Sequence, residues 1–118
     1  MALCEDQSII LGLEDGVYHR TVSGDIQLAH QPIQIKGRRF NDGKVGPDGM
    51  YYVGTTDNDG NGAFYRMSDG KIEELFGECR CSNGIDWSGD RKTLYYCDSL
   101  YHKVECFAFN ARTHELSD

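Results

Sequence analysis

Two asparagines in similar surroundings stand out as side chains that could hold an ion or a polar ligand. Asn41 lies in "RRFNDG" and Asn83 lies in "CSNGID", 42 positions later. Each stretch is followed by a turn and then by an apolar run that resembles a strand. However, Asn-Asp-Gly and Asn-Gly are also favoured in hairpin turns, because Asn and Gly tolerate positive φ. The spacing alone leaves both interpretations open.

The strand-like runs that would position these amides repeat along the chain. Apolar runs begin at Ile9, Tyr51 and Leu94, which are 42 and 43 residues apart. Each is followed by two further runs rich in β-branched and aromatic residues, with Gly, Asp or Ser between them. A period near 40 that is built only of strands is typical of a β-propeller blade. The segments 38–42 and 82–87 fall where the first strand of a four-stranded blade belongs, so the sequence predicts an all-β fold of propeller blades.

Counting strands divides the chain into about three blades. The first, about residues 1–36, is expected to lack its inner strand, and the others occupy about 37–79 and 80–118. The first strand of each blade lines the central channel of a propeller, so Asn41 and Asn83 are expected at one height on neighbouring blades. An arc of three blades also leaves two apolar faces open. We expect the remaining blades or another chain to cover these faces.

Composition excludes several classes of partner. The 118 residues are enough for one domain. The net charge is −7, and no basic stripe is present that could neutralise phosphates, which argues against nucleic acid as a partner. No apolar run approaches the roughly 18 residues of a membrane span, and no membrane partner is expected. The five cysteines fit neither a disulfide framework nor a paired metal motif. We therefore expect free thiols in a cytoplasmic protein, with Cys97 and Cys106 in the core.

Three other features are given structural interpretations. "DNDGNG" at 57–62 matches the first half of an EF-hand loop, but Ser68 stands where the bidentate Glu is needed. Its place between two strand-like runs predicts a hairpin loop instead. The four histidines share no ligand spacing. Trp87 follows an inner strand and is expected to pack between blades.

Two long stretches resemble a known family. "RRFNDGKVGPDGMYYVGTT" (38–56) is similar to the RxNDG and DPxG motifs of the senescence-marker-protein, gluconolactonase and luciferin-regenerating-enzyme family, to which regucalcin-like proteins belong. "SNGIDWSGDRKTLYYCDSLYHKVECFAFN" (82–110) resembles the SNG and YYxDS motifs of the same family. The match covers nearly all of this chain but only the middle portion of the family.

The resemblance implies a six-bladed propeller, of which this chain supplies about three blades. It implies a metal-dependent lactonase that hydrolyses a sugar lactone to the aldonic acid, with one divalent ion (Ca²⁺, Zn²⁺, Mg²⁺ or Mn²⁺) in the channel. Carried over by motif, Asn83 is a metal ligand, and Arg39 and Asn41 contact the substrate. Asp98 matches the YYxDS aspartate, which we interpret as structural.

The carboxylate ligands that the family places before and after this segment fall outside the chain, and the catalytic base is unassigned. The short loop after the run at 51–55 also departs from the family, so lactone specificity does not transfer. The alternatives are a non-catalytic calcium-binding or interaction propeller and a fragment without activity of its own. We expect the chain alone to be inactive.

Overall fold

The computed structural model describes residues 1–31, 36–68 and 70–117, and within them the regular structure consists of strands alone. The first six strands are β1 (Ala2–Leu3), β2 (Ile9–Gly12), β3 (Val17–Arg20), β4 (Ile26–His30), β5 (Arg39–Val45) and β6 (Tyr51–Thr56). The next six are β7 (Gly62–Ser68), β8 (Lys71–Cys79), β9 (Ser82–Trp87), β10 (Thr93–Asp98), β11 (Lys103–Asn110) and β12 (Glu115–Ser117). In the described segments, no helix has the length and apolar character needed to cross a membrane.

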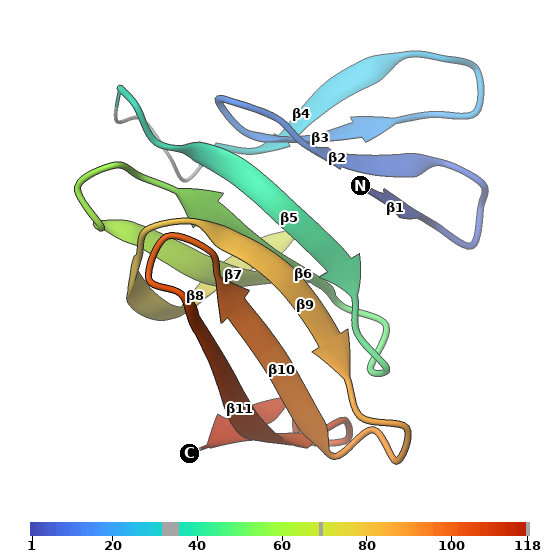
Figure 1. The fold of residues 1–118 in the computed structure, drawn as a ribbon. Coiled ribbons are helices and arrows are strands. Elements are labelled where there is room, and N and C mark those ends of the chain that lie inside the picture. The colour runs from blue at the N-terminus through green and yellow to red at the C-terminus, as the bar shows by residue number, and fades with distance from the viewer. Residues whose placement is uncertain (32–35, 69, 118) are drawn as a thin grey trace.

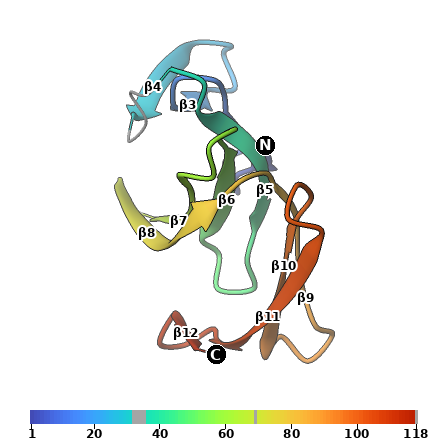
Figure 2. The same ribbon diagram turned by 60° about the vertical axis from the view of Figure 1, so that its left-hand side comes forward.

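The strands form three antiparallel four-stranded sheets that follow one another along the chain. Their orders are β1-β2-β3-β4, β5-β6-β7-β8 and β9-β10-β11-β12, so every strand pairs with its neighbour in sequence. The first strands of consecutive sheets meet: β5 contacts both β1 and β9. β5 and β9 run side by side (Figures 1 and 2). This arrangement confirms the predicted all-β fold of consecutive propeller blades.

The first sheet contains one strand more than the sequence suggested. The two residues of β1 pair with β2, Ala2 opposite Ile10 and Leu3 opposite Ile9. A turn whose Cys4 N–H donates to Ser8 O joins the two strands. Two residues are too few to display the alternation by which a strand is recognised, which explains why β1 was not expected. The connection to the second sheet includes residues 32–35, which lie outside the described part.

The core lies between the sheets, and the middle sheet is buried on both faces. One apolar cluster joins the first two sheets and another joins the last two. Successive residues of β6 alternate between them, because Tyr51 and Val53 belong to the first cluster and Tyr52 belongs to the second. Trp87 packs edge-on against Tyr52 across the second junction, with ring centroids 5.1 Å apart. The expected packing of Trp87 between blades is therefore confirmed.

The cysteines are free thiols, but their burial corrects one expectation. Cys97 is only half-buried and Cys106 is exposed, although both were expected in the core. They lie in β10 and β11 on the face of the third sheet that no further sheet covers. An apolar strand pattern identifies residues that suit burial, but it does not reveal whether a neighbouring sheet is present to bury them.

Candidate functional site

The asparagines at 41 and 83 lie inside strands and not in hairpin turns. In the β5–β6 pair, Phe40 is opposite Thr55 and Gly43 is opposite Val53, so two residues of β5 face Gly54 alone. The same irregularity occurs in the next sheet, where two residues of β9 lie opposite Cys97 alone. Each asparagine is the first residue of such a β-bulge, a distortion that redirects a side chain out of the regular strand pattern. The hairpin-turn interpretation of both motifs is therefore wrong.

Two glycines make the bulges possible. Gly84, the second residue of the β9 bulge, has φ of +136°, and a Cβ there would stand 2.9 Å from Cys97 Cβ. Gly54 faces the β5 bulge, and a Cβ on it would collide with the side chain of Ser82. Because glycine lacks that atom, β9 can approach β6 closely at this height. The two bulges therefore meet across the junction between the sheets.

Asn41 joins the two bulges directly. Its Nδ2 donates to the carbonyl oxygen of Ser82 over 2.9 Å, so the amide touches the backbone just before Asn83. Its Oδ1 accepts a hydrogen bond of 3.1 Å from Arg39 Nη1. The structure thus brings Arg39 and Asn41 into contact and places Asn41 against the strand that carries Asn83. The convergence of the two amides on one ligand stays a prediction.

The three predicted residues differ in exposure. Arg39 and Asn83 are exposed, and Asn41 is half-buried. Asn41 uses both ends of its amide in the contacts described above, which fixes its orientation. The exposed Asn83 is therefore the better placed of the two asparagines to offer an amide oxygen to a ligand.

Asp42 is a carboxylate of the β5 bulge that the sequence analysis did not single out. It is half-buried, and its Oδ1 accepts the N–H of Gly43 over 2.9 Å. Burial, together with the negative charge of Asp42, raises the pKa of the adjacent Tyr51 to about 12. The signal was its position directly after Asn41, because the two residues of a bulge lie opposite the same residue of the partner strand.

Asp98 holds the start of β9 in place. This side chain is 1% exposed, and it accepts backbone N–H groups from Arg80 (2.7 Å), Cys81, Leu100 and Tyr101 (each 3.1 Å). Burial alone would raise the pKa of Asp98, but these donors hold it below its usual value. Asp98 therefore has the structural role expected from the sequence, fixing the segment that leads into Asn83.

A charged pair continues along the same two strands. Lys44 Nζ of β5 lies 2.8 Å from Asp86 Oδ1 of β9, and both side chains are well exposed. The hydrogen bond from Lys44 lowers the pKa of Asp86. β5 and β9 thus expose polar side chains along the edge they share, whereas the sheets behind it are packed with aromatic residues. These polar residues are Arg39, Lys44, Asn83 and Asp86.

The described residues fit a bound cation only in part. Nowhere in 1–31, 36–68 or 70–117 do three His, Cys, Asp or Glu side chains come together as metal ligands. Asp57, which opens the EF-hand-like stretch, pairs instead with Arg38 over 3.0 Å and accepts the N–H of Asp59. The hydrogen bond from Arg38 lowers the pKa of Asp57. This stretch is the β6–β7 hairpin loop, as predicted. Asn83, the predicted metal ligand, has a single neutral oxygen to offer.

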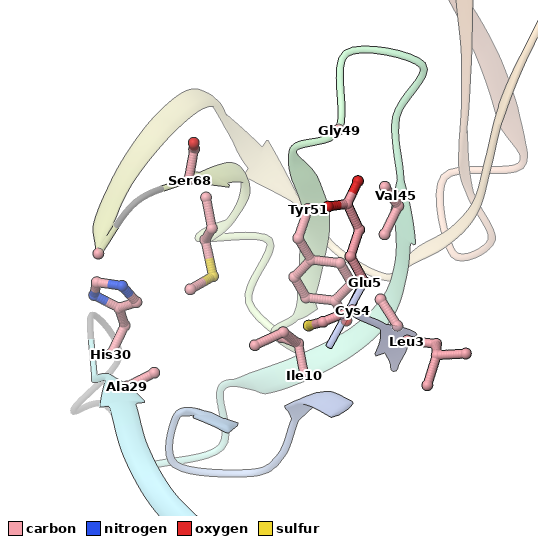
Figure 3. A pocket seen from close by; sticks show the side chains of 13 residues that line it. Leu3, Cys4, Glu5, Ile10, Ala29, His30, Val45, Gly49, Tyr51 and Ser68 are labelled. Carbon is pink, nitrogen blue, oxygen red and sulfur yellow. The ribbon is translucent and has the colours of Figure 1, made fainter. Parts of the chain in front are cut away.

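A cavity of about 440 Å³ lies between the first two sheets, away from these residues (Figure 3). Its lining includes Val45, at the opposite end of β5 from Arg39. Cys4, Glu5 and His30 also line it, and Figure 3 shows His30 across the cavity from Glu5. These side chains do not form a metal-binding group in the described residues. We therefore place the candidate site at the two bulges.

Comparison with known proteins gives consistent matches. A family model described as the SMP-30/gluconolactonase/LRE-like region matches residues 1–118. Regucalcin from Bos taurus is 38% identical over 102 residues, which cover 79% of this chain and 34% of that protein. A solved luciferin-regenerating enzyme matches with a TM-score of 0.88 and 27% identity, covering 100% of this chain and 44% of its own. A regucalcin from Agrobacterium tumefaciens, described as a calcium-binding protein, has a TM-score of 0.86 and 26% identity, with coverage of 98% and 41%.

These matches also show how much of each relative is represented. The chain spans about a third of the length of the curated regucalcins. It spans less than half of the two solved chains. The propeller blades described above therefore correspond to one part of each relative.

Proposed function

The chain belongs to the SMP-30/gluconolactonase/LRE-like family, and from this membership we propose that it forms part of a metal-dependent lactonase acting on a sugar lactone. The observation that supports the proposal is the pair of matched bulges, which carry Asn41 and Asn83 on adjoining strands. Bulges are enriched beside active sites because they redirect side chains out of the sheet. Arg39, in contact with Asn41, adds a cation at the same place.

In this proposal Asn83 is one ligand of a divalent cation (Ca²⁺, Zn²⁺, Mg²⁺ or Mn²⁺). When bound, such an ion polarises a lactone carbonyl and lowers the pKa of a coordinated water. Asn83 suits the role because its amide is exposed and sits on a strand whose start is fixed by Asp98. Hard cations take six to eight oxygen ligands that usually include carboxylates, so the amide oxygen of Asn83 does not complete the site by itself.

Arg39 and Asn41 are proposed to bind and orient the sugar lactone. The guanidinium of Arg39 can donate several hydrogen bonds to hydroxyl or carboxylate oxygens, and it already donates to Asn41 Oδ1. Asn41 is held by Ser82 O, so it presents Arg39 in a defined position. A substrate clamped by these two side chains would lie beside β9 and its Asn83.

A second candidate, a calcium-binding propeller without catalysis, is supported by two observations. The Agrobacterium relative is described as a calcium-binding protein. Within the described residues, no three acidic, cysteine or histidine side chains are grouped in a way that would complete a metal centre around Asn83. On this alternative the two bulges would hold an ion without promoting hydrolysis.

The two candidates differ in what happens to a lactone. We expect the 118-residue chain alone to hydrolyse no aldonolactone above background, because it lacks most of the metal ligands. The direct test is a chimera in which this chain replaces the matching segment of bovine regucalcin, assayed with a panel of aldonolactones and divalent metals. The proposal predicts metal-dependent hydrolysis by the chimera.

Variants of the chimera assign the residues. Asn83→Ala should weaken metal binding and activity together, with partial rescue at high metal concentration. Arg39→Ala should raise KM more than it lowers kcat, since Arg39 is proposed to act in binding. Asn58→Ala, in the exposed β6–β7 loop, is the matched control. A chimera that binds metal but hydrolyses no lactone of the panel, measured beside unmodified bovine regucalcin, would favour the calcium-binding candidate.

A further inference from the structure

Cys81 directly precedes β9, and its thiol lies against the side-chain amide of Asn41. Asn41 Nδ2 is 3.9 Å from Cys81 Sγ, a distance at which sulfur can accept a weak hydrogen bond. The same nitrogen donates to the carbonyl oxygen of Ser82 over 2.9 Å, and Asn41 Oδ1 accepts from Arg39 Nη1. A side-chain amide carries two N–H donors. One donor of Asn41 can therefore serve Ser82 while the other faces Cys81.

The backbone of Cys81 is held on both sides of the thiol. Its N–H lies 3.1 Å from each carboxylate oxygen of the buried Asp98, and its carbonyl oxygen accepts the N–H of Ser99 over 2.9 Å. Cys81 also forms a β-bridge with Thr56, the last residue of β6, and Thr56 pairs with Arg39 of β5. The surrounding strands thus determine where the thiol meets the edge shared by β5 and β9.

The Asn41 side chain depends on contacts of this kind because it belongs to a β-bulge. Residues of a bulge interrupt the regular ladder of paired strands, so the ladder does not fix their side-chain direction. Arg39, one partner of the amide, is exposed, and a long exposed side chain keeps much of its rotamer freedom. The contacts from Cys81 and Ser82 are therefore the ones that can fix the Asn41 amide.

We propose that Cys81 is a positioning residue for Asn41. Its thiol holds the second N–H of the amide, so that Asn41 Oδ1 stays turned toward Arg39. The inference rests on the proposed role of Arg39 and Asn41 in binding a sugar lactone. Through Cys81, the fixed backbone around Asp98 is connected to these two side chains.

The test is the NMR signal of the Asn41 side-chain NH₂ group in the 118-residue chain. Cys81→Ala removes the acceptor, so both Asn41 amide proton signals should shift and their exchange with water should rise about threefold. Cys81→Ser keeps an acceptor at this position and should show a smaller change than Cys81→Ala. Cys4→Ala is the matched control, because Cys4 is also half-buried but follows β1 in the first sheet. This variant should leave the Asn41 signals unchanged.

A valine variant separates hydrogen bonding from packing. Valine occupies at least the space of the thiol but accepts no hydrogen bond, so Cys81→Val should change the Asn41 signals as Cys81→Ala does. It also serves as the test if the alanine variant does not fold, and circular dichroism verifies that each variant keeps its strands. Unchanged Asn41 signals in either folded variant would overturn the proposal. Equal changes in Cys81→Ser and Cys81→Val would overturn it too.

Kinetics of the chimera with bovine regucalcin provide a second readout. Cys81→Ala should raise KM about threefold to tenfold and change kcat much less, because Asn41 is proposed to bind the lactone. A fall in kcat with unchanged KM would contradict the positioning role. An unmodified chimera without activity would count against the lactonase proposal alone, and the Asn41 amide signals would still decide the role of Cys81.

Discussion

Replacing Asp98 by Asn should destabilise the chain strongly at neutral pH. Asp98 Oδ2 accepts the N–H of Arg80, while Oδ1 accepts those of Leu100 and Tyr101, in a site that is 1% exposed. An asparagine keeps one acceptor and turns an NH₂ group toward the remaining donors. Losing charge-assisted bonds and leaving a buried donor unpaired should reduce the free energy of unfolding by about 3 kcal/mol. For a domain of this size, that corresponds to a fall in Tm of about 10 °C.

The pH dependence of this effect has a definite sign. Because the pKa of Asp98 is lower in the folded chain than in the unfolded chain, its stabilisation is fully present above the unfolded pKa of about 3.9. It is lost as the pH falls through the lower folded value. The difference between the wild-type chain and Asp98→Asn should therefore be largest near pH 7 and shrink below about pH 4.

The assay is urea or thermal unfolding at pH 7 and at pH 3, at one protein concentration because association would add stability. Asp59→Asn, at an exposed position of the β6–β7 loop, removes an equal charge and should change stability little. The reasoning would be refuted if Asp98→Asn matched the wild type at pH 7. It would also be refuted if the loss of stability stayed the same at pH 3.

Two further substitutions test how the blades pack. Gly84→Ala should destabilise the chain by about 2 kcal/mol, because the new Cβ meets Cys97 and the φ of Gly84 is +136°. Gly89→Ala is the control and should be nearly neutral, because a Cβ on Gly89 would meet no atom within 4 Å. Equal free energies of unfolding for the two variants would contradict the bulge geometry. Tyr52→Phe removes the hydroxyl that donates to the buried carboxylate of Asp48 over 2.8 Å. The free energy of unfolding, measured by urea titration, should fall by about 1–2 kcal/mol. An unchanged urea midpoint would show that water replaces this donor.

The blades could be predicted because their signals are repeated and local. Runs of strand-forming residues recur three times, and the turns between them carry Gly, Asp and Ser. The position of Trp87 between blades and the hairpin loop that begins at Asp57 followed from the same pattern. Strand β1 could not be predicted, because two residues carry no alternation.

The candidate residues could be named from the sequence, but the geometry that positions them could not be predicted. The spacing of Asn41 and Asn83 suggested that they share a height in the fold, but local sequence preferences favoured turns equally. Tertiary contacts decided between the two interpretations, because Gly54 lets β9 approach β6, and two residues of β5 and of β9 lie opposite a single residue of the next strand. The exposure of Cys106 was also beyond the sequence, since it depends on whether a further sheet covers the third one.

The most direct test of the proposed site is an NMR titration of the asparagine side-chain amides with Ca²⁺ and with Zn²⁺. We predict that the Asn83 amide of the 118-residue chain shifts with a dissociation constant on the order of 1 mM, as expected for an incomplete ligand set. Asn58, in the β6–β7 loop, should not shift, and Asn83→Ala should abolish the effect. Shifts at Asn58 with none at Asn83 would contradict the account, and so would micromolar binding at Asn83.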